Sequence, residues 1–404
     1  MRLLPVRVGA GHLVLAEPDT SGLGACSVDV LAALVEARRL GASAAFLQPV
    51  AVWPQALAQL TTDVPRRTLT GLVGPWCRAR WRRVSLVQRL SSWRREKALS
   101  FRREMARELR RHAGNERVPA GVRTGLKDAA RAVGHPVPAP RPLRFPRRLL
   151  RERVQVSLDR DARARAGAEA MAAGIPVDRP LVAFELPQRV ESALPAVAFL
   201  RDHGYWIVRI GDPRGGRVEL PGVVDLACAP RANALLEFFV LQSARFLACE
   251  STDLQHAAYL TGTPTLTLNA RDPISRYPVR RDGIFTLTRA IDLDSGRVIP
   301  LAERLEAPFF LNERNIGHTP NAPETILEAV REMHEGTSAA WHDTAEQAAF
   351  RAAVTEAAGA LAANVPLVAD MGADEGFVGD GRLARVQAAA LEPGARSLKS
   401  GGAG

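Results

Sequence analysis

Residues 246–270 read FLACESTDLQHAAYLTGTPTLTLNA, and this stretch decides the class of the fold. An apolar run ends at Cys249, and four polar residues, 250–253, follow it. The next residues suit a helix, Gly262 and Pro264 suit a turn, and a second apolar run begins. A strand, a polar turn, a helix and a strand in this order are typical of a parallel βαβ unit.

The polar turn in this unit is a candidate ligand site. A helix that opens at Asp253 would expose backbone N–H groups and a partial positive charge, which together bind phosphate. The hydroxyls of Ser251 and Thr252 would add hydrogen-bond donors, with Glu250 just before them and His256 on the first turn. The alternative is ordinary capping, in which these side chains satisfy the helix N–H groups and bind no ligand.

The sequence on either side of this unit repeats the same alternation of strands and helices. Apolar runs that suit strands are PLVAFEL, GYWIVRIG, GVVDLAC, RFLACE and TPTLTLN. Segments with helical spacing separate several of them, at 191–203, 232–244 and 253–261, and a further helix is expected within 321–335. Continuous apolar strands alternating with helices predict a parallel sheet covered on both faces. Ligands of such sheets bind outside the carboxyl ends of the strands.

Two other loops are candidates for ligand contact. Arg209, Gly211 and Asp212 follow an apolar strand and would reach the same sheet edge, although the alternative is a simple turn. Gly22 and Gly24 precede a helical segment and would permit close approach of a ligand to the backbone. Their spacing is not that of a dinucleotide-binding loop.

The N-terminal part predicts a second α/β domain with a basic insertion. Residues 3–9 suit a strand, Ser27 and Gly41 suit the start and stop of a helix, and residues 43–50 suit another strand. From Trp76 to Arg165 arginines crowd between tryptophans, and prolines recur from 119 to 146. The basic segment suits an anionic membrane surface or another anionic partner, and the alternative is a solvated helical face with core tryptophans.

Length and composition limit the remaining possibilities. The chain has 404 residues, which suits two domains, and a formal net charge of +11. No segment suits a membrane span or a signal peptide, and the four cysteines show no metal-site or redox spacing. We therefore expect a cytoplasmic protein without a metal site, and no specific nucleic-acid partner, because no recognition motif accompanies the basic segment.

The ordered set of motifs GYWIVRIGDP, GVVDLA, ARFLACESTDLQHAAYLTGTPTLTLN and NAPETILEAVREM resembles a bacterial family of GT-B-type glycosyltransferases. More distantly it is similar to the heptosyltransferases. The resemblance covers residues 180–335 well and the N-terminus faintly. It implies a GT-B-like α/β fold, with two Rossmann-like domains facing a cleft and a C-terminal helical extension. The implied ranges are 1–150 for the acceptor domain with its basic helical insertion, 151–179 for a linker and helix, 180–336 for the nucleotide-sugar domain, and 337–404 for a helical extension and disordered tail.

The resemblance also implies roles for individual residues. Donor-binding positions would be Arg209, Gly211, Asp212, Glu250, Ser251, Thr252, Gln255 and His256. Asp253 stands where the family usually has glycine, and its carboxylate would repel a diphosphate unless it caps the helix or meets a cation. In AFELPQRVE, Glu185 and Arg189 stand where many relatives carry a histidine-containing loop, so they join Gly22 and Gly24 as cleft candidates.

The leading hypothesis is a cofactor-free and metal-independent glycosyltransferase for hexosyl or related transfer. It would move a sugar from a nucleotide-sugar donor to a glycan, lipid-linked or other glycoconjugate acceptor, as in polysaccharide biosynthesis, with peripheral attachment to the inner face of an anionic membrane. His12, Glu17 and Asp19 are the candidates for the general base. The alternatives are a nucleotide-sugar epimerase on the same architecture and a degenerate, non-catalytic binding protein.

Overall fold

The computed structural model describes residues 2–8, 11–17, 23–41, 43–46, 60–62, 66–68, 154, 156–186, 190–211, 213, 216–229, 234–250, 252–274, 277–310, 315–363, 365, 368 and 380–389. The chain divides into two compact units. The N-terminal unit comprises residues 1–142 and 152–162, and the C-terminal unit comprises residues 143–151 and 163–404. Each unit is described by itself.

The N-terminal unit contains a four-stranded sheet in the order β1-β2-β3-β5. Strands β1 (Arg2–Val8) and β2 (Gly11–Glu17) form an antiparallel hairpin, whereas β2 pairs in parallel with β3 (Ser43–Phe46) and β3 with β5 (Arg66–Thr68). Strand β4 (Leu60–Thr62) pairs separately with β6 (Val156–Leu158). Helix α1 (Leu23–Arg39) connects β2 to β3 in a βαβ unit, but the first strand of this unit is β2, whereas the sequence predicted residues 3–9, which overlap the antiparallel strand β1.

The start of α1 differs from the prediction. The helix begins at Leu23, so Ser27 lies inside it, 1% exposed, and is not the N-cap. The predicted stop is confirmed, because Gly41 adopts a φ of 59° and its N–H donates to the carbonyl of Arg38. Ser27 lies on the same buried face of the helix as Val30 and Leu34, so its side chain is packed inside the unit and does not cap the helix.

A seven-stranded sheet forms the centre of the C-terminal unit, in the order β15-β12-β11-β10-β7-β8-β9. All of its strand pairings are parallel, which confirms the predicted sheet. The strands are β7 (Leu181–Phe184), β8 (Trp206–Arg209), β9 (Val223–Asp225), β10 (Ala244–Cys249), β11 (Thr265–Ala270), β12 (Gly283–Leu287) and β15 (Arg382–Leu383). The chain builds outward from β7 to β9, then crosses back to place β10 on the other side of β7.

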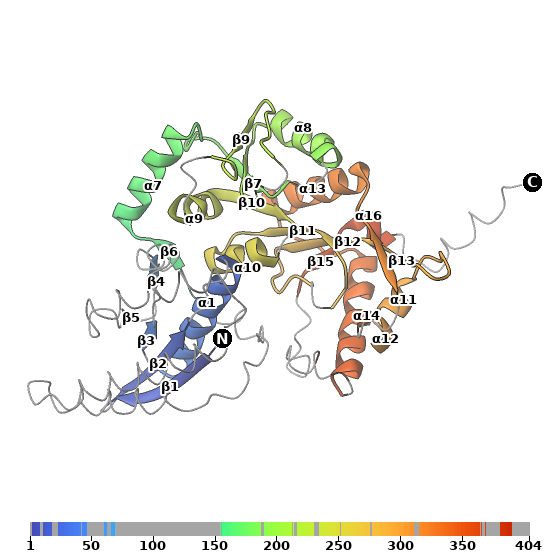
Figure 1. Cartoon of the computed structure of the whole chain (residues 1–404), viewed down its shortest axis with the longest axis horizontal. Coiled ribbons are helices and arrows are strands. Elements are labelled where there is room, and N and C mark those ends of the chain that lie inside the picture. Colours follow the sequence, from blue (N-terminus) through green and yellow to red (C-terminus); the bar gives the residue numbers. More distant parts are fainter. Residues whose placement is uncertain are drawn as a thin grey trace, which may run out of the picture. The chain divides into compact units, whose positions relative to one another are not determined.

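Helices cover both faces of this sheet (Figure 1). On one face α8 (Leu194–Asp202), preceded by a 3₁₀ turn at Val190–Ala193, packs against α13 (Pro323–Ser338). On the other face α9 (Ala234–Ser243) packs against α10 (Thr252–Thr261). Helix α7 (Arg160–Ala172) lies against α9, where Gly167 approaches the ring of Phe239.

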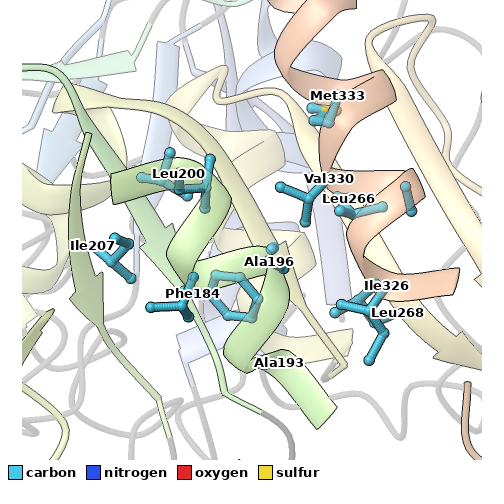
Figure 2. Packing of buried hydrophobic residues seen from close by; sticks show 14 of the residues in the cluster. Phe184, Ala193, Ala196, Leu200, Ile207, Leu266, Leu268, Ile326, Val330 and Met333 are labelled. Carbon is cyan, nitrogen blue, oxygen red and sulfur yellow. The ribbon is translucent and has the colours of Figure 1, made fainter. Parts of the chain in front are cut away.

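The core follows the two-residue period of the strands. On β7, β10 and β11, alternate residues point toward α8 and α13: Val182 and Phe184, Phe246 and Ala248, and Leu266 and Leu268. They meet Ala193, Ala196, Leu200, Ile326, Val330 and Met333 from the helices (Figure 2). Full burial of one such large apolar side chain stabilises a fold by about 1.5–3 kcal/mol, so this cluster contributes substantially to the stability of the sheet.

Several elements between and after the predicted ones were not expected. Strand β12 and the antiparallel pair β13 (Arg289–Asp292) and β14 (Ile316–Thr319) were not among the predicted elements, nor were the short helices α11 (Leu301–Arg304) and α12 (Ala307–Phe310) between them. After α14 (Ala345–Ala362), strand β15 and helix α16 (Arg385–Ala389) return to the sheet. Part of the predicted C-terminal extension is therefore an edge of the sheet itself.

Residues 76–153 of the basic segment and the predicted disordered end lie outside the described residues, whereas the end of the basic segment contains β6 and the start of α7. Among the helices that the structure does describe, none combines the length and the hydropathy needed to cross a bilayer.

Candidate functional site

The crossover between β7 and β10 places two glutamates side by side at the carboxyl edge of the sheet. Glu185 follows β7 and Glu250 follows β10. The Glu185 N–H donates to the carbonyl of Ala248 at 2.8 Å, and the Glu250 N–H donates to Oε2 of Glu185 at 2.9 Å. This is the point where open α/β sheets bind ligands, because the connections from β7 and β10 leave in opposite directions.

Helix α10 opens directly beside these glutamates. Its first residue is Thr252, two residues after Glu250, and the helix runs for ten residues. Its first N–H groups therefore face the carboxyl edge at the crossover, as the sequence predicted. Ser251 lies outside the described residues, and only the backbone positions of Thr252 and Asp253 are described, so the predicted roles of these three side chains stay predictions.

The carboxylate of Glu250 is held by Asn269 at the end of the neighbouring strand β11. The Asn269 side-chain amide donates to Oε1 of Glu250, and no described residue forms an ion pair with this carboxylate. Burial raises the pKa of Glu250; the hydrogen bond from Asn269 opposes the rise, and the nearby charge of Glu185 adds to it. Glu250 is thus an oriented hydrogen-bond acceptor without a protein counter-ion among the described residues.

Asn269 also joins the sheet to the start of α13 through Asn321. Asn269 has a φ of 55°, the left-handed conformation that asparagine tolerates better than most residues. The Asn321 N–H donates to Oδ1 of Asn269 at 2.6 Å, and the Asn321 side-chain amide donates to the carbonyl of Leu287 at 2.8 Å. Thr286 donates its hydroxyl to Oδ1 of Asn321 at 2.5 Å. One hydrogen-bond network therefore links the ends of β7, β10, β11 and β12.

This network changes the interpretation of Asn321. The sequence favours Asn321 as the cap of the following helix, but the N-cap of α13 is Ala322, which makes no side-chain capping hydrogen bond. The Asn321 side chain instead forms hydrogen bonds with Thr286 and Leu287 of β12, where buried donors and acceptors need partners.

Gly211 brings the chain after β8 close to the same crossover. It adopts a φ of 93°, and a Cβ at this position would lie 2.8 Å from Cδ1 of Leu254 and 3.5 Å from Cγ of Glu185. Only glycine permits both the backbone conformation and the contact. The structure therefore places Gly211 close to the crossover, as the sequence predicted. A contact of Gly211 with a donor stays a prediction.

Arg209, at the end of β8, makes buried contacts with the chain around β9. Its side chain is 3% exposed, and its guanidinium donates to Oδ2 of Asp225 at 2.8 Å and to the carbonyl of Gly216. The same carboxylate accepts from the N–H groups of Val218 and Cys228. These contacts are internal and join the ends of β8 and β9, and donor binding by Arg209 stays a prediction.

Gln255 likewise makes an internal contact. It is 3% exposed, and its amide donates to the hydroxyl of Thr267 at 2.9 Å, which ties α10 to β11. His256 is half-buried, with its ring centroid 6.2 Å from that of Tyr259 on the same helix. Donor binding by either residue stays a prediction.

The remaining predicted residues lie either in the N-terminal unit or outside the described residues. His12 and Glu17 lie on β2, in register with Arg7 and Arg2 of β1, and Gly24 lies in α1. All three belong to the N-terminal unit. The other residues, Asp19, Gly22, Arg189 and Asp212, lie outside the described residues.

Sequence reasoning missed one titratable group at the same edge. Helix α9 connects β9 to β10, so it starts at the carboxyl edge, and Glu237 lies in its first turn. Burial raises the pKa of Glu237 to about 7, and the carboxylate has no hydrogen bond or ion pair with any described residue. A lone carboxylate in the otherwise apolar segment ALLEFFVLQ was the signal that could have identified it.

No metal centre accompanies these groups in the region of the chain that the structure describes. Within it, no three or more His, Cys, Asp or Glu side chains are placed to hold one ion.

No protein-family model matches the sequence, and no curated protein matches it. Among solved structures, the chain is similar to the ADP-heptose LPS heptosyltransferase II of E. coli, with 14% identity and a TM-score of 0.42 over 81% of this chain and 99% of that one. It is also similar to a family 9 glycosyl transferase from Veillonella parvula, with 12% identity and a TM-score of 0.46 over 79% of this chain and 96% of that one. These values describe a distant likeness of backbone and assign no role to any residue.

Proposed function

We propose that the protein is a glycosyltransferase that uses a nucleotide-sugar donor and needs no metal ion. The observation that carries the proposal is the start of α10 beside Glu250, at the crossover of a parallel sheet. The motif resemblance of residues 180–335 adds the reaction class. A helix start at a crossover suits a diphosphate, and an oriented carboxylate suits hydroxyl donors such as those of ribose or a sugar.

The two features favour different portions of one ligand. The diphosphate would lie over the N–H groups that begin at Thr252, where the helix dipole is favourable. It would avoid Glu250, because two negative charges in a half-buried site repel each other. A hydroxyl-bearing portion of the ligand would instead donate to Glu250, whose orientation Asn269 maintains.

Transfer would then proceed by positioning and electrostatic stabilisation. The acceptor hydroxyl would lose its proton to a base and form a bond to the anomeric carbon, while the bond from that carbon to the diphosphate oxygen breaks. The departing diphosphate carries the added negative charge, and preorganised N–H groups of α10 would stabilise it. His12, Glu17 and Asp19 remain the proposed candidates for the base.

The finer assignments follow from the resemblance and are proposals too. They are a GT-B arrangement, donor binding by residues 180–336, acceptor binding by residues 1–150, and hexosyl or related transfer to a glycan or lipid-linked acceptor in the cytoplasm. Peripheral attachment through the basic segment, most of which lies outside the described residues, is tested by sedimentation with anionic and neutral vesicles.

The test compares nucleotide binding and sugar transfer in matched variants. Wild type, Ser251→Ala/Thr252→Ala and the control Thr337→Ala/Ser338→Ala are incubated with UDP, ADP, GDP and CDP, and their melting temperatures are measured. A ligand that binds only the folded protein raises the melting temperature. The control likewise removes one threonine and one serine hydroxyl, but at the C-terminal end of α13, where the Thr337 hydroxyl donates to the carbonyl of Met333.

We expect one diphosphate to stabilise wild type and control, and this gain to fall by more than half in the site variant. The corresponding nucleotide-sugars are then tested with and without an acceptor mixture. Equal stabilisation of all three proteins would place the diphosphate elsewhere. An altered sugar without any acceptor would indicate an epimerase, and diphosphate binding without either reaction would indicate a non-catalytic binding protein.

A further inference from the structure

Arg304 is a buried cation that no carboxylate among the described residues neutralises. The residue is 6% exposed, and its two terminal nitrogens donate to backbone carbonyls, those of Thr288 at 2.9 Å and Arg271 at 2.8 Å. No described residue forms an ion pair with it. Its Nε–H is buried and has no hydrogen-bond partner within the described structure. A buried charge is unfavourable unless it is paired, so this guanidinium has unused capacity for an anion.

Two more nitrogen-bearing side chains meet Arg304 at the ends of β11 and β12. Arg271 directly follows β11, and its exposed side chain forms no ion pair with a described residue. His318 on β14 places Nδ1 2.9 Å from the hydroxyl of Thr288, the residue whose carbonyl accepts from Arg304. The three groups therefore share one short stretch of backbone.

The surroundings of this cluster are partly apolar. The ring of Phe309 lies 5.5 Å from the Arg304 guanidinium and 6.4 Å from the His318 ring, measured to the ring centroid. An apolar wall lowers the local dielectric and strengthens the attraction of the cluster for an anion.

The charge states suit an anion at neutral pH. Burial lowers the pKa of Arg304 to about 10, so it stays protonated. Burial, and then the charges of Arg304 and Arg271, lower the pKa of His318, so its neutral ring still has an N–H to donate. One carboxylate, Asp272, lies near enough to oppose both shifts, and its Oδ1 accepts from the N–H of Ile274. Asp272 therefore offsets part of the positive charge at Arg304, and its carboxylate already accepts a backbone hydrogen bond.

The position of the cluster relates it to the candidate site. Both lie at the carboxyl edge, with Glu250 at the end of β10 and Thr288 after the end of β12. Two strand spacings separate β10 from β12, which is roughly 10 Å. Asn269 and Asn321 connect the two places, because Asn269 donates to Glu250 and Asn321 donates to the carbonyl of Leu287. The edge is therefore acidic at the crossover and basic at the end of β12.

We infer that Arg271, Arg304 and His318 form an oxyanion subsite, which takes a carboxylate or phosphate group about 10 Å from the group that Glu250 binds. The subsite is separate from the start of α10. Anion binding stands on the cluster itself, whereas the assignment of the anion to an acidic sugar or to a phosphorylated acceptor rests on the proposed function.

The first experiment measures anion binding to the full chain. Inorganic phosphate and D-glucuronate are titrated in buffer of constant ionic strength, with D-glucose as the uncharged control. Binding is followed by the melting temperature and by the imidazole NMR signal of His318, which His318→Gln identifies. Arg271→Gln removes the exposed guanidinium of the subsite. Arg281→Gln removes another exposed guanidinium at the opposite edge, where the Arg281 side chain is 79% exposed and lies 3.9 Å from Asp380.

We expect one or both anions to bind in the millimolar range, to shift the His318 signal and to raise the pKa of His318, because an adjacent anion favours the imidazolium. Arg271→Gln should weaken this binding about tenfold, as expected for the loss of one charge-assisted hydrogen bond. Arg281→Gln should leave it unchanged. Phosphate bound at α10 instead would be lost in Ser251→Ala/Thr252→Ala and kept in Arg271→Gln.

Two results would overturn the inference: no effect of either anion on the His318 signal, or equal anion affinity in wild type and Arg271→Gln. A preference for glucuronate would favour an acidic sugar, and a preference for phosphate would favour a phosphorylated group. The inference and the proposed function fail separately. Nucleotide binding without an anion effect at His318 removes only the subsite, and an anion effect without any nucleotide binding removes only the proposed function.

Discussion

Two pairs of strand ends at the same edge of the sheet differ in whether their charged side chains form an ion pair. At the ends of β8 and β9, Arg209 and Asp225 are 3% and 5% exposed and form an ion pair of 2.8 Å. At the ends of β7 and β10, Glu250 is only half-buried, accepts from Asn269 and has no described ion-pair partner. Both regions lie at the same edge of one sheet. The two sites therefore differ in which side chains form ion pairs, and not in their location in the fold.

The comparison separates structural charge from charge that a ligand can use. Asp225 accepts from Arg209, Val218 and Cys228, so little of its hydrogen-bonding capacity remains. Glu250 retains acceptor capacity and some exposure. Sequence inspection assigned the strand-end residues of both regions the same role, because a strand-end position alone does not show which charges neutralise each other.

The largest expected effect is the loss of the buried pair. Asp225→Asn should lower the free energy of unfolding by about 3–5 kcal/mol, because it removes the carboxylate that forms an ion pair with the buried Arg209. Urea unfolding followed by circular dichroism measures this change. Asp202→Asn is the matched control, since Arg201 and Asp202 form an exposed pair of 3.4 Å whose loss should change stability by less than about 0.5 kcal/mol. Similar losses in both variants would contradict the comparison.

A smaller effect is expected at the unpaired carboxylate of Glu237. The rise in its pKa from 4.5 to about 7 means that the folded state disfavours the ionised form. Wild type should therefore lose stability between pH 4.5 and pH 7, where the folded protein binds the proton more tightly than the unfolded chain. With allowance for partial exposure, the loss is on the order of 2 kcal/mol.

Glu237→Gln removes this titration. We expect the variant to match wild type near pH ~4 and to be more stable by about 2 kcal/mol near pH ~8, as measured by urea unfolding at each pH. A variant that is equally destabilised at both pH values would show that Glu237 has a structural partner when ionised.

The smallest change in stability is expected at Glu250, although the substitution is chemically the same as Asp225→Asn. Glu250→Gln should alter the free energy of unfolding by less than about 1 kcal/mol, because Asn269 can donate to the amide oxygen and no cation is left unpaired. Its effect should appear in binding, as a lower affinity for the stabilising nucleotide in calorimetry. A loss of stability as large as that of Asp225→Asn, or unchanged nucleotide affinity, would place Glu250 among the structural charges.

The agreement between sequence and structure depends on how local each feature is. Segments such as LVAF and FLAC are apolar without interruption, and the structure confirms them as buried parallel strands. Helix starts that were predicted from a single polar residue differed from the structure. Ser27 and Asn321 both suit helix caps. In the structure Ser27 lies inside α1, and Asn321 forms hydrogen bonds with the sheet, because tertiary packing places neither residue at an N-cap. Strand β15 is two residues long and has no periodicity to recognise.

The sequence by itself determined the alternation of strands and helices, the parallel sheet and the polar turn at residues 250–253, because hydrophobic periodicity and helix-start chemistry are local properties. Only the tertiary structure decided that Arg209 is neutralised by Asp225, that Asn269 holds Glu250, and that Arg304 is buried without a carboxylate partner among the described residues. These facts depend on which strand ends become neighbours. The order β12-β11-β10-β7-β8-β9 sets those neighbours, and the packing of distant segments sets the order.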